Sequence, residues 1–293
     1  MDISNLKIAY FGGEPLGVPV LIELQKAGIM PSVVLCNPDR PVGRKRELTP
    51  PPVKQWAVEH DITVIQPKEI KSEEFKEYMT AQSFDLFIVV AYNKIMPKWL
   101  VELPKYGTIN VHPSLLPLLR GASPIRTSIL QDMREQCGVT IMQMDEKMDH
   151  GPILVQKTLS IPEEQWPVHG QELDCKLAEL GGILLSQTIP KYINGEITPD
   201  EQPHNEATYC GRLDRSIGEL TLDPMSLPAG EEAHKMLLKI RAFDGFPGTF
   251  FIHEQKRVKV LDAYISQDAL HIINVIPEGK NKMDFDVYLQ TLS

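Results

Sequence analysis

The segment 85–91 is the feature that most constrains how this chain folds, because it is almost continuously apolar. A strand that is apolar on both sides is typical of a parallel sheet whose two faces are covered by helices. Further apolar runs at 6–11, 32–36, 63–66 and 108–112 are separated by segments with helical periodicity. This alternation predicts an α/β protein with a doubly wound, mostly parallel sheet.

The length of 293 residues fits one large or two ordinary domains. A polar stretch at 199–205 separates the α/β pattern from a helical pattern at 227–243. We therefore expect a large domain at 1–203, a linker at 204–212 and a small domain at 213–293. The other expected elements are helices at about 15–26, 52–60, 69–81, 122–131 and 168–192, and strands at 139–144, 152–159, 248–253, 257–265 and 269–276.

Charge and composition argue against several classes of function. The net charge of -9 argues against indiscriminate binding to nucleic acid, although it does not exclude a local basic patch. The segment 37–54 is the best candidate for such a patch, and a solvated surface loop is the alternative interpretation. The chain has no apolar run of about 18 residues, and its four cysteines include no CxxC pair. We expect no membrane span, zinc site or disulfide framework, and free thiols in a reducing compartment.

Three polar residues form the most informative functional pattern. Asn110 and His112 end the expected strand at 108–112, and Asp149 follows in a later segment. A neutral Asn polarises a carbonyl, a His moves a proton, and an Asp holds the imidazole in one tautomer. This is chemistry for transferring an acyl group without a metal or a covalent intermediate. Taken alone, a strand-end His that caps a loop is the simpler interpretation.

The predicted topology favours one shared site. In doubly wound sheets, ligands bind beyond the carboxyl ends of the strands. His112 is expected at one such end, the segment 91–97 at another, and the loop 145–149 at a third. The sequence therefore predicts that these three segments meet.

Two longer stretches connect this pattern to a known family. Residues 109–117 with 120–125, and residues 139–145 with 148–151, resemble the signature of the folate-dependent formyltransferases. The segment 37–54 is similar to an insertion loop in the branch of that family that formylates methionyl-tRNA. The resemblance covers roughly residues 6 to 200 well and the remainder weakly.

The resemblance implies a fold, a reaction and a set of residues. It implies a Rossmann-like formyltransferase domain at 1–203 that uses 10-formyltetrahydrofolate as co-substrate and no metal. The implied catalytic residues are Asn110, His112 and Asp149. The implied folate-binding residues are Tyr92, Lys94, Ile95, Met96, Asp145 and Met148. The implied residues that bind the acceptor are Arg40, Arg44, Lys45, Ser114, Leu115 and Pro117.

The implied acceptor is charged initiator methionyl-tRNA, whose α-amino group attacks the formyl carbon directly. Such an enzyme serves translation initiation, and we expect it to be a monomer. The N-terminus has no secretory signal, so we expect it in the cytoplasm, or in an organelle matrix after processing.

Two features depart from the family pattern. Asn93 stands where the enzymes that act on tRNA usually have Gly, which affects a turn or the width of the folate pocket. Residues 213–293 hold 9 Lys and Arg against 12 Asp and Glu and contain about three strands. We expect a reduced, OB-like barrel that is hard to close, and its tRNA-binding mode is in doubt.

Two other functions stay open at this point. One is N-formylation of another amine, such as a nucleotide-linked amino sugar, which the short acidic C-terminal part mildly favours. The other is a non-catalytic module that binds folate or RNA. The presence of Asn110, His112 and Asp149 opposes that reading, because binding alone needs no proton shuttle.

Overall fold

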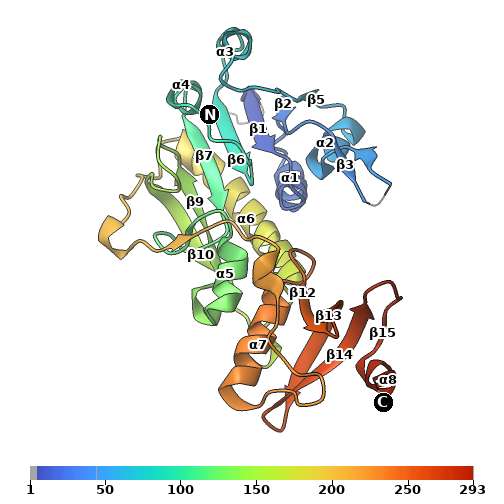
Figure 1. Ribbon diagram of the computed structural model, residues 1–293. Helices are drawn as coiled ribbons and strands as arrows, with labels where there is room; N and C mark the ends of the chain where they lie inside the picture. Colours follow the sequence, from blue (N-terminus) through green and yellow to red (C-terminus); the bar gives the residue numbers. More distant parts are fainter. Residues whose placement is uncertain (1–4, 44, 293) are drawn as a thin grey trace. The chain divides into compact units, whose positions relative to one another are not determined.

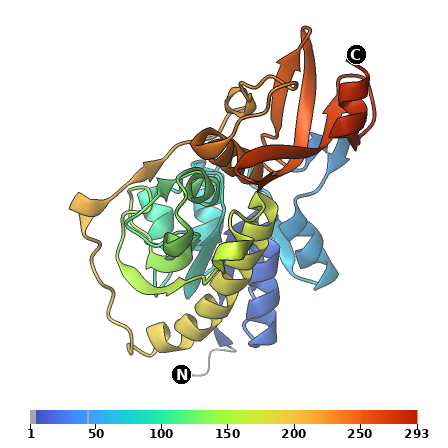
Figure 2. The same cartoon turned by 90° about the horizontal axis from the view of Figure 1, so that it is seen from below.

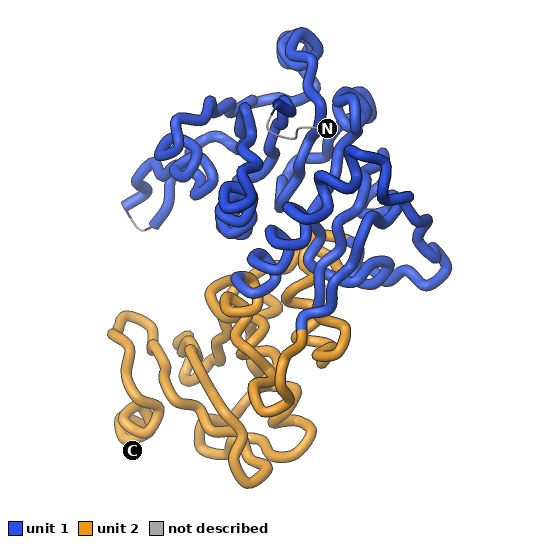
Figure 3. The backbone as a smooth tube through the Cα atoms, turned by 180° about the vertical axis from the view of Figure 1, so that it is seen from behind, with its two compact units in different colours: residues 1–120, 138–159, 175–209 blue, residues 121–137, 160–174, 210–293 orange. Residues whose placement is uncertain are grey.

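The structure is a computed structural model, and it describes residues 5–43 and 45–292. The chain divides into two compact units, each made of several segments (Figure 3). Unit 1 contains residues up to 120, 138–159 and 175–209, and unit 2 contains residues 121–137, 160–174 and 210 onward.

Unit 1 is built on a seven-stranded sheet with the order β10-β9-β7-β6-β1-β2-β5 (Figure 1). Every residue of β1, β2 and β6 is buried, which confirms the central strand predicted from the segment 85–91. The strands are β1 (Ile8–Gly12), β2 (Val33–Leu35), β5 (Thr63–Ile65), β6 (Leu86–Val90), β7 (Thr108–His112), β9 (Gly138–Gln143) and β10 (Ile153–Thr158).

Helices cover both faces of this sheet. Successive side chains of a strand point to opposite faces, so each strand contributes apolar side chains to both helical layers. Phe11 and Phe87 pack with Phe75 of α3 and Leu100 of α4 on one face. Tyr10 points to the other face and donates to the carbonyl of Gly17 in α1. Helices α1 and α6 lie side by side on that second face (Figure 1, Figure 2). The helices are α1 (Gly17–Lys26), α2 (Pro52–Glu59), α3 (Glu73–Thr80), α4 (Lys98–Val101) and α6 (Gly170–Ile193), whose first residues belong to unit 2.

One topological expectation was wrong. β6 and β7 run parallel, but β9 pairs antiparallel with β7, with Ile109 opposite Gln143 and His112 opposite Thr140. The carboxyl end of β9 therefore lies at the opposite edge of the sheet from His112. The loop 144–152 must turn back over the sheet to contribute to a site beside β7.

Unit 2 contains an antiparallel sheet with the order β12-β13-β14-β15. The three predicted strands are present, and the two-residue β15 was not predicted. A core that includes Leu237, Phe251, Val260 and Tyr288 joins α7, this sheet and α8. The elements are α5 (Pro124–Leu130), α7 (Gly230–Ala242), β12 (Thr249–His253), β13 (Lys256–Ser266), β14 (Ala269–Pro277), β15 (Met283–Asp284) and α8 (Phe285–Gln290).

Short elements complete the described chain. They are β3 (Arg40–Val42), β4 (Glu47–Thr49), β8 (Arg120–Gly121), β11 (Tyr209–Cys210) and short 3₁₀ turns at Arg134–Gln136, Glu163–Gln165, His204–Glu206 and Ser216–Gly218. Across residues 5–43 and 45–292, no helix combines the length and the apolar character that crossing a bilayer requires.

The core of unit 2 gives a stability prediction. Phe251→Ala removes a fully buried ring, so we expect the free energy of unfolding of this unit to fall by about 3–5 kcal/mol. Ile252→Ala, at the neighbouring and exposed position, is the matched control and should change it by less than about 0.5 kcal/mol. Urea unfolding followed by fluorescence measures both values, and equal effects would contradict the assigned core.

Candidate active site

His112 is the last residue of β7 and is buried. Its Nε2 lies 3.1 Å from the carbonyl oxygen of Leu119. A carbonyl only accepts hydrogen bonds, so Nε2 carries a proton in this arrangement. Nδ1 is then the basic nitrogen of the neutral imidazole, and it lies 3.6 Å from Oδ1 of Asp149. That distance is beyond a hydrogen bond, so the interaction is electrostatic and strengthens when the imidazole is protonated.

Asn110 lies two residues before His112 on the same face of β7. Val111, between them, points to the other face, where it contacts Gly181 of α6. Asn110 is half-buried, so its amide is open to a ligand beside the imidazole. The face of β7 that carries both side chains is the one away from α6.

The loop 144–152 brings Asp149 to this face. Gln143 donates from its backbone N–H to the carbonyl of Pro152, and this bond closes the base of the loop. The loop is compact at Gly151, where an added Cβ would lie 2.1 Å from the carbonyl oxygen of Gln143. Only glycine fits there without displacing the turn.

Three residues around the site have a left-handed backbone. Ala91 at the end of β6, Leu119 beside His112, and Asp149 all have left-handed φ values, of 48°, 58° and 49°. Such conformations are costly for residues with a Cβ, and they persist only where the surroundings enforce them. Their position at the three segments that flank β7 marks a region held in a required geometry.

The loop after His112 is fixed by its own contacts. The Ser114 hydroxyl donates to the carbonyl of Leu118, and the Ser114 carbonyl accepts from the Thr140 hydroxyl. Leu115 packs over Gly138, and the carbonyl of Pro117 accepts from the Thr208 N–H. Of the three acceptor residues predicted here, Ser114 is buried and uses its hydroxyl within the loop.

Two predicted folate residues lie exposed on neighbouring loops. The side chain of Ile95, after β6, is 75% exposed and that of Met148 is 60% exposed. Lys98 and Glu146 form an ion pair of 3.6 Å, which places these two loops beside each other. Exposed apolar side chains on adjacent loops are typical of a slot for a flat, apolar ligand.

The other four predicted folate residues have internal contacts. Met96 is buried, and the ring of Tyr92 packs edge-on against Phe11. Burial raises the pKa of Tyr92. Lys94 donates to the carbonyls of Pro67 and Lys68, and burial lowers its pKa. Asp145 accepts from the ring of His150 at 2.6 Å. The side chains of Met96, Lys94 and Asp145 are therefore engaged within the protein, whereas Ile95 and Met148 are exposed.

Asn93 connects two loops of the same unit. Its amide Nδ2 donates to Oε1 of Glu14 at 2.5 Å, joining the loop after β6 to the loop after β1. The residue with positive φ in this turn is Ala91, and not Asn93. The Asn that stands at position 93 in place of the usual Gly therefore affects the loop through this hydrogen bond and not through a positive φ.

The basic segment forms a hairpin of β3 and β4, which stands away from the large sheet (Figure 1). Arg40 and Lys45 are exposed, as are the apolar side chains of Val42 and Leu48. Lys54 is not part of the exposed set, because it pairs with Asp39 at 2.8 Å. Arg44, also predicted to bind the acceptor, lies outside the described residues.

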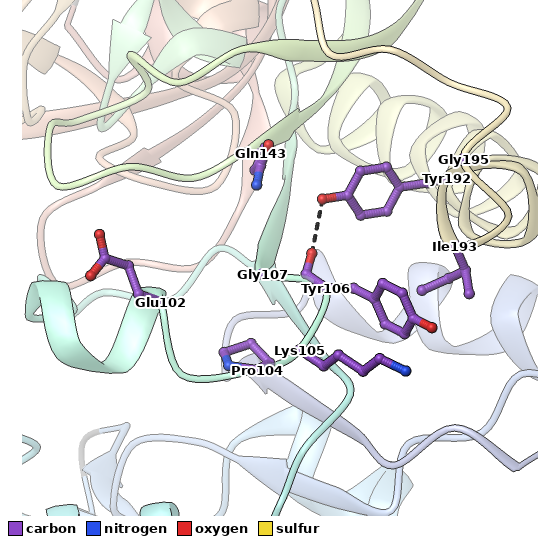
Figure 4. Close-up of a pocket in the computed structure, with 9 residues that line it drawn as sticks. All are labelled: Glu102, Pro104, Lys105, Tyr106, Gly107, Gln143, Tyr192, Ile193 and Gly195. Carbon is purple, nitrogen blue, oxygen red and sulfur yellow. Dashed lines mark hydrogen bonds between the residues drawn. The ribbon is translucent and has the colours of Figure 1, made fainter.

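A shallow cavity of about 560 Å³ lies at the other end of β7 (Figure 4). Gly107 lines it and precedes the first residue of β7, whereas His112 is the last. The Tyr192 hydroxyl donates to the carbonyl of Tyr106 across it. The cavity is therefore separate from the cluster of His112 and Asp149.

Sequence reasoning missed Gln202 and Arg120. Gln202 lies in the polar stretch 199–205, yet it is 3% exposed and donates to the backbone carbonyls of Asp149 and Gly151. Arg120 is 1% exposed and donates to Oε1 of Gln202. The position of Arg120 within the family signature, at the start of the segment 120–125, was the one available signal.

The comparison with protein families identifies the class. Residues 6–189 match the sequence model of the formyl transferase family. This match covers more than half of the chain, so the chain belongs to the formyl transferase family.

Named relatives lie within this family. The methionyl-tRNA formyltransferase of Halorhodospira halophila is 39% identical over 257 residues, which cover 88% of this chain and 79% of that protein. The methionyl-tRNA formyltransferase of a Geobacillus species is 44% identical over 210 residues, 72% of this chain and 65% of that protein.

Solved structures share the fold. A 4-N formyltransferase from Francisella tularensis superposes with a TM-score of 0.65 at 21% identity, over 89% of this chain and 99% of that one. Methionyl-tRNA formyltransferase from Clostridium thermocellum gives a TM-score of 0.61 at 16% identity, over 93% and 98%. At these identities the likeness concerns the fold alone.

The close fit at Gly151 gives a second prediction. Gly151→Ala should displace the turn that carries Asp149 and lower kcat for formyl transfer by about 10²-fold, the usual effect of a misplacement on the order of 1 Å. Gly211→Ala is the control, because nothing lies within 4 Å of its added Cβ. Steady-state kinetics on both folded variants measure kcat. Normal turnover in Gly151→Ala would show that the close fit of this turn is not needed for catalysis.

Proposed function

We propose that this protein transfers the formyl group of 10-formyltetrahydrofolate to the α-amino group of initiator methionyl-tRNA. The observation that carries the proposal is the approach of Asp149 to His112 at 3.6 Å, with Asn110 two residues before His112 on the same strand. The relatives named methionyl-tRNA formyltransferase, at 38–44% identity, support the acceptor.

The proposed reaction needs three groups. The amine nitrogen forms a bond to the formyl carbon, and the bond from that carbon to the folate nitrogen breaks. The Asn110 amide donates to the oxygen as it gains charge. Nδ1 of His112 takes the proton that the amine loses and returns it to the leaving folate nitrogen. The Asp149 carboxylate stabilises the imidazolium between these two steps.

The donor fits the described residues. The exposed side chains of Ile95 and Met148 offer apolar surface to a pteridine ring. The strained turns at Ala91 and Asp149 present backbone groups beside them. We place the ring between these loops and its formyl group next to Asn110. Among the residues that the structure describes, no three His, Cys, Asp or Glu side chains are grouped so that they could hold a metal ion.

The β3–β4 hairpin fits the tRNA acceptor. Arg40, Lys45 and Arg46 are exposed cations on a hairpin that also exposes Val42 and Leu48. Phosphates attract the cations, and unpaired bases stack on apolar and guanidinium surfaces. We propose that this hairpin holds the end of the acceptor stem.

The organisation of the chain is part of the proposal. We propose a catalytic domain at 1–203 and a separate small domain at 213–293, supported by the core that α7, β12–β14 and α8 share. We also propose that the protein acts as a monomer. An enzyme that acts on charged tRNA works where translation occurs, and we propose the cytoplasm.

The deciding experiment offers two acceptors side by side. Purified protein and 10-formyltetrahydrofolate are incubated with charged initiator tRNA or with nucleotide-linked amino sugars, and formylated product is measured. We expect formylmethionyl-tRNA. Transfer to the amino sugar alone would show that the acceptor is an amino sugar and not tRNA. Folate binding without any transfer would indicate a non-catalytic binding module.

A third prediction concerns the proton shuttle. His112→Ala should lower kcat by about 10²–10⁴-fold while folate still binds, because a general acid–base group contributes that much. Asp149→Asn should cause a comparable loss, since the imidazolium then lacks a charged partner. Single-turnover assays and folate titration measure the two effects. Near-normal turnover in both folded variants would exclude these roles.

A fourth prediction concerns the hairpin. Arg40→Ala/Lys45→Ala should weaken transfer to charged tRNA and reduce its salt dependence, because each lost phosphate contact lowers the slope by about 0.7–0.9. Folate affinity should not change. Lys26→Ala/Lys76→Ala removes the same charge from α1 and α3 and is the control. If transfer to a small amine fell equally, the hairpin would instead support the catalytic centre.

A further inference from the structure

We infer that Gln202 is a positioning residue for the reaction, and that with Arg120 it holds the strained turn carrying Asp149 at the distance His112 requires. This inference rests on the proposed function for its kinetic test. The structural part, which concerns how the turn is held, stands on contacts within unit 1 alone.

Gln202 bonds the backbone of the turn at two places. Its Nε2 donates to the carbonyl of Asp149 at 3.0 Å and to the carbonyl of Gly151 at 2.7 Å. Both hydrogens of the amide are therefore used on one turn. A side-chain amide buried to this extent is costly unless its bonds are made, so these two bonds are kept.

Arg120 fixes the other end of the same amide. Its Nε and Nη2 donate to Oε1 of Gln202 at 3.1 and 2.6 Å, and Nη2 also lies 2.9 Å from Nδ1 of His204. A guanidinium is planar and presents its donors in a fixed fork. Because it binds Oε1, the fork determines which end of the Gln202 amide faces the turn. Arg120 thus sets Gln202 as a donor toward Asp149.

These contacts close into a ring that includes His112. Nε2 of His112 bonds the carbonyl of Leu119, and the next residue is Arg120. From Arg120 the ring passes through Gln202 to the backbone of Asp149, whose carboxylate faces Nδ1 of His112. One short segment, 119–120, therefore orients the imidazole directly and the carboxylate through Gln202.

The turn needs such a restraint. Asp149 has a φ of 49°, in the left-handed region that residues with a Cβ adopt only infrequently. The loop has a second contact of this kind, since His150 bonds Asp145 and stacks on His204 at 3.9 Å between ring centroids. Gln202 bonds the backbone of the strained residue itself, at the carbonyl of Asp149.

A double-mutant cycle tests the inference. Gln202→Met keeps the length of the side chain and removes its hydrogen bonds. We expect kcat to fall by about 10–100-fold, as when a group supporting a reactive residue is lost, with KM for donor and acceptor within about threefold. In the Asp149→Asn background the same change should add less than about threefold, because Gln202 acts through Asp149.

The controls separate positioning from general stability. Tyr192→Phe removes one buried bond to a backbone carbonyl at the far end of β7 and should leave kcat unchanged. Amide exchange at 145–151 should quicken in Gln202→Met and not in Tyr192→Phe. If Gln202→Met does not fold, Gln202→Asn keeps the amide but is one carbon too short, and the same results are expected from it.

Two results would overturn the inference. One is a double variant whose kcat falls by the full product of the fold losses caused by Gln202→Met and by Asp149→Asn alone. The other is a folded variant with unchanged kcat and unchanged amide exchange at 145–151. If the wild type does not formylate charged tRNA, the proposed function fails while the exchange measurement still decides whether Gln202 holds the turn.

Discussion

The active geometry depends on one constraint, the return of the loop 144–152 over the sheet toward His112, because β9 runs antiparallel to β7. β9 leads the chain away from His112, and the turn at Asp149 brings it back. This works because Gly151 packs on the Gln143 carbonyl and because Asp149 accepts a left-handed backbone. Both features are strained or crowded, so the site relies on neighbours that hold them.

Chemistry and acceptor recognition are placed on different kinds of structure. Asn110 and His112 belong to a buried strand, where positions are precise to fractions of an ångström. The cations proposed to bind tRNA stand on an exposed two-stranded hairpin. A flexible polyanion needs charge and reach more than fixed distances, whereas proton transfer needs a fixed distance. The net charge of -9 makes the exposed cations of this hairpin stand out against an acidic surface.

Local patterns in the sequence predicted the elements better than their directions. The run 85–91 gave β6 because a doubly covered strand has an unmistakable composition, and the three strands of unit 2 followed from alternation. The antiparallel course of β9 was not predictable, because an apolar strand reads the same in either direction. Gln202 was missed for a similar reason. A polar residue in a polar stretch gives no sign of burial until the fold brings Arg120 and the Asp149 turn to it.

The buried guanidinium of Arg120 indicates that the contacts around Asp149 and His112 favour a fixed orientation over stability. Removing a charge from water costs several kcal/mol, and an apolar side chain of similar volume would serve stability as well or better. Arg120 is instead fully buried and bonded to the polar side chains of Gln202 and His204. Such an arrangement fixes the orientation of the Arg120 and Gln202 side chains at a cost in stability. The reason is that the donors of a guanidinium lie in a fixed planar geometry. The same residue pair, 119–120, reaches both His112 and Asp149, so a change that relaxed it would disturb the imidazole and the carboxylate together.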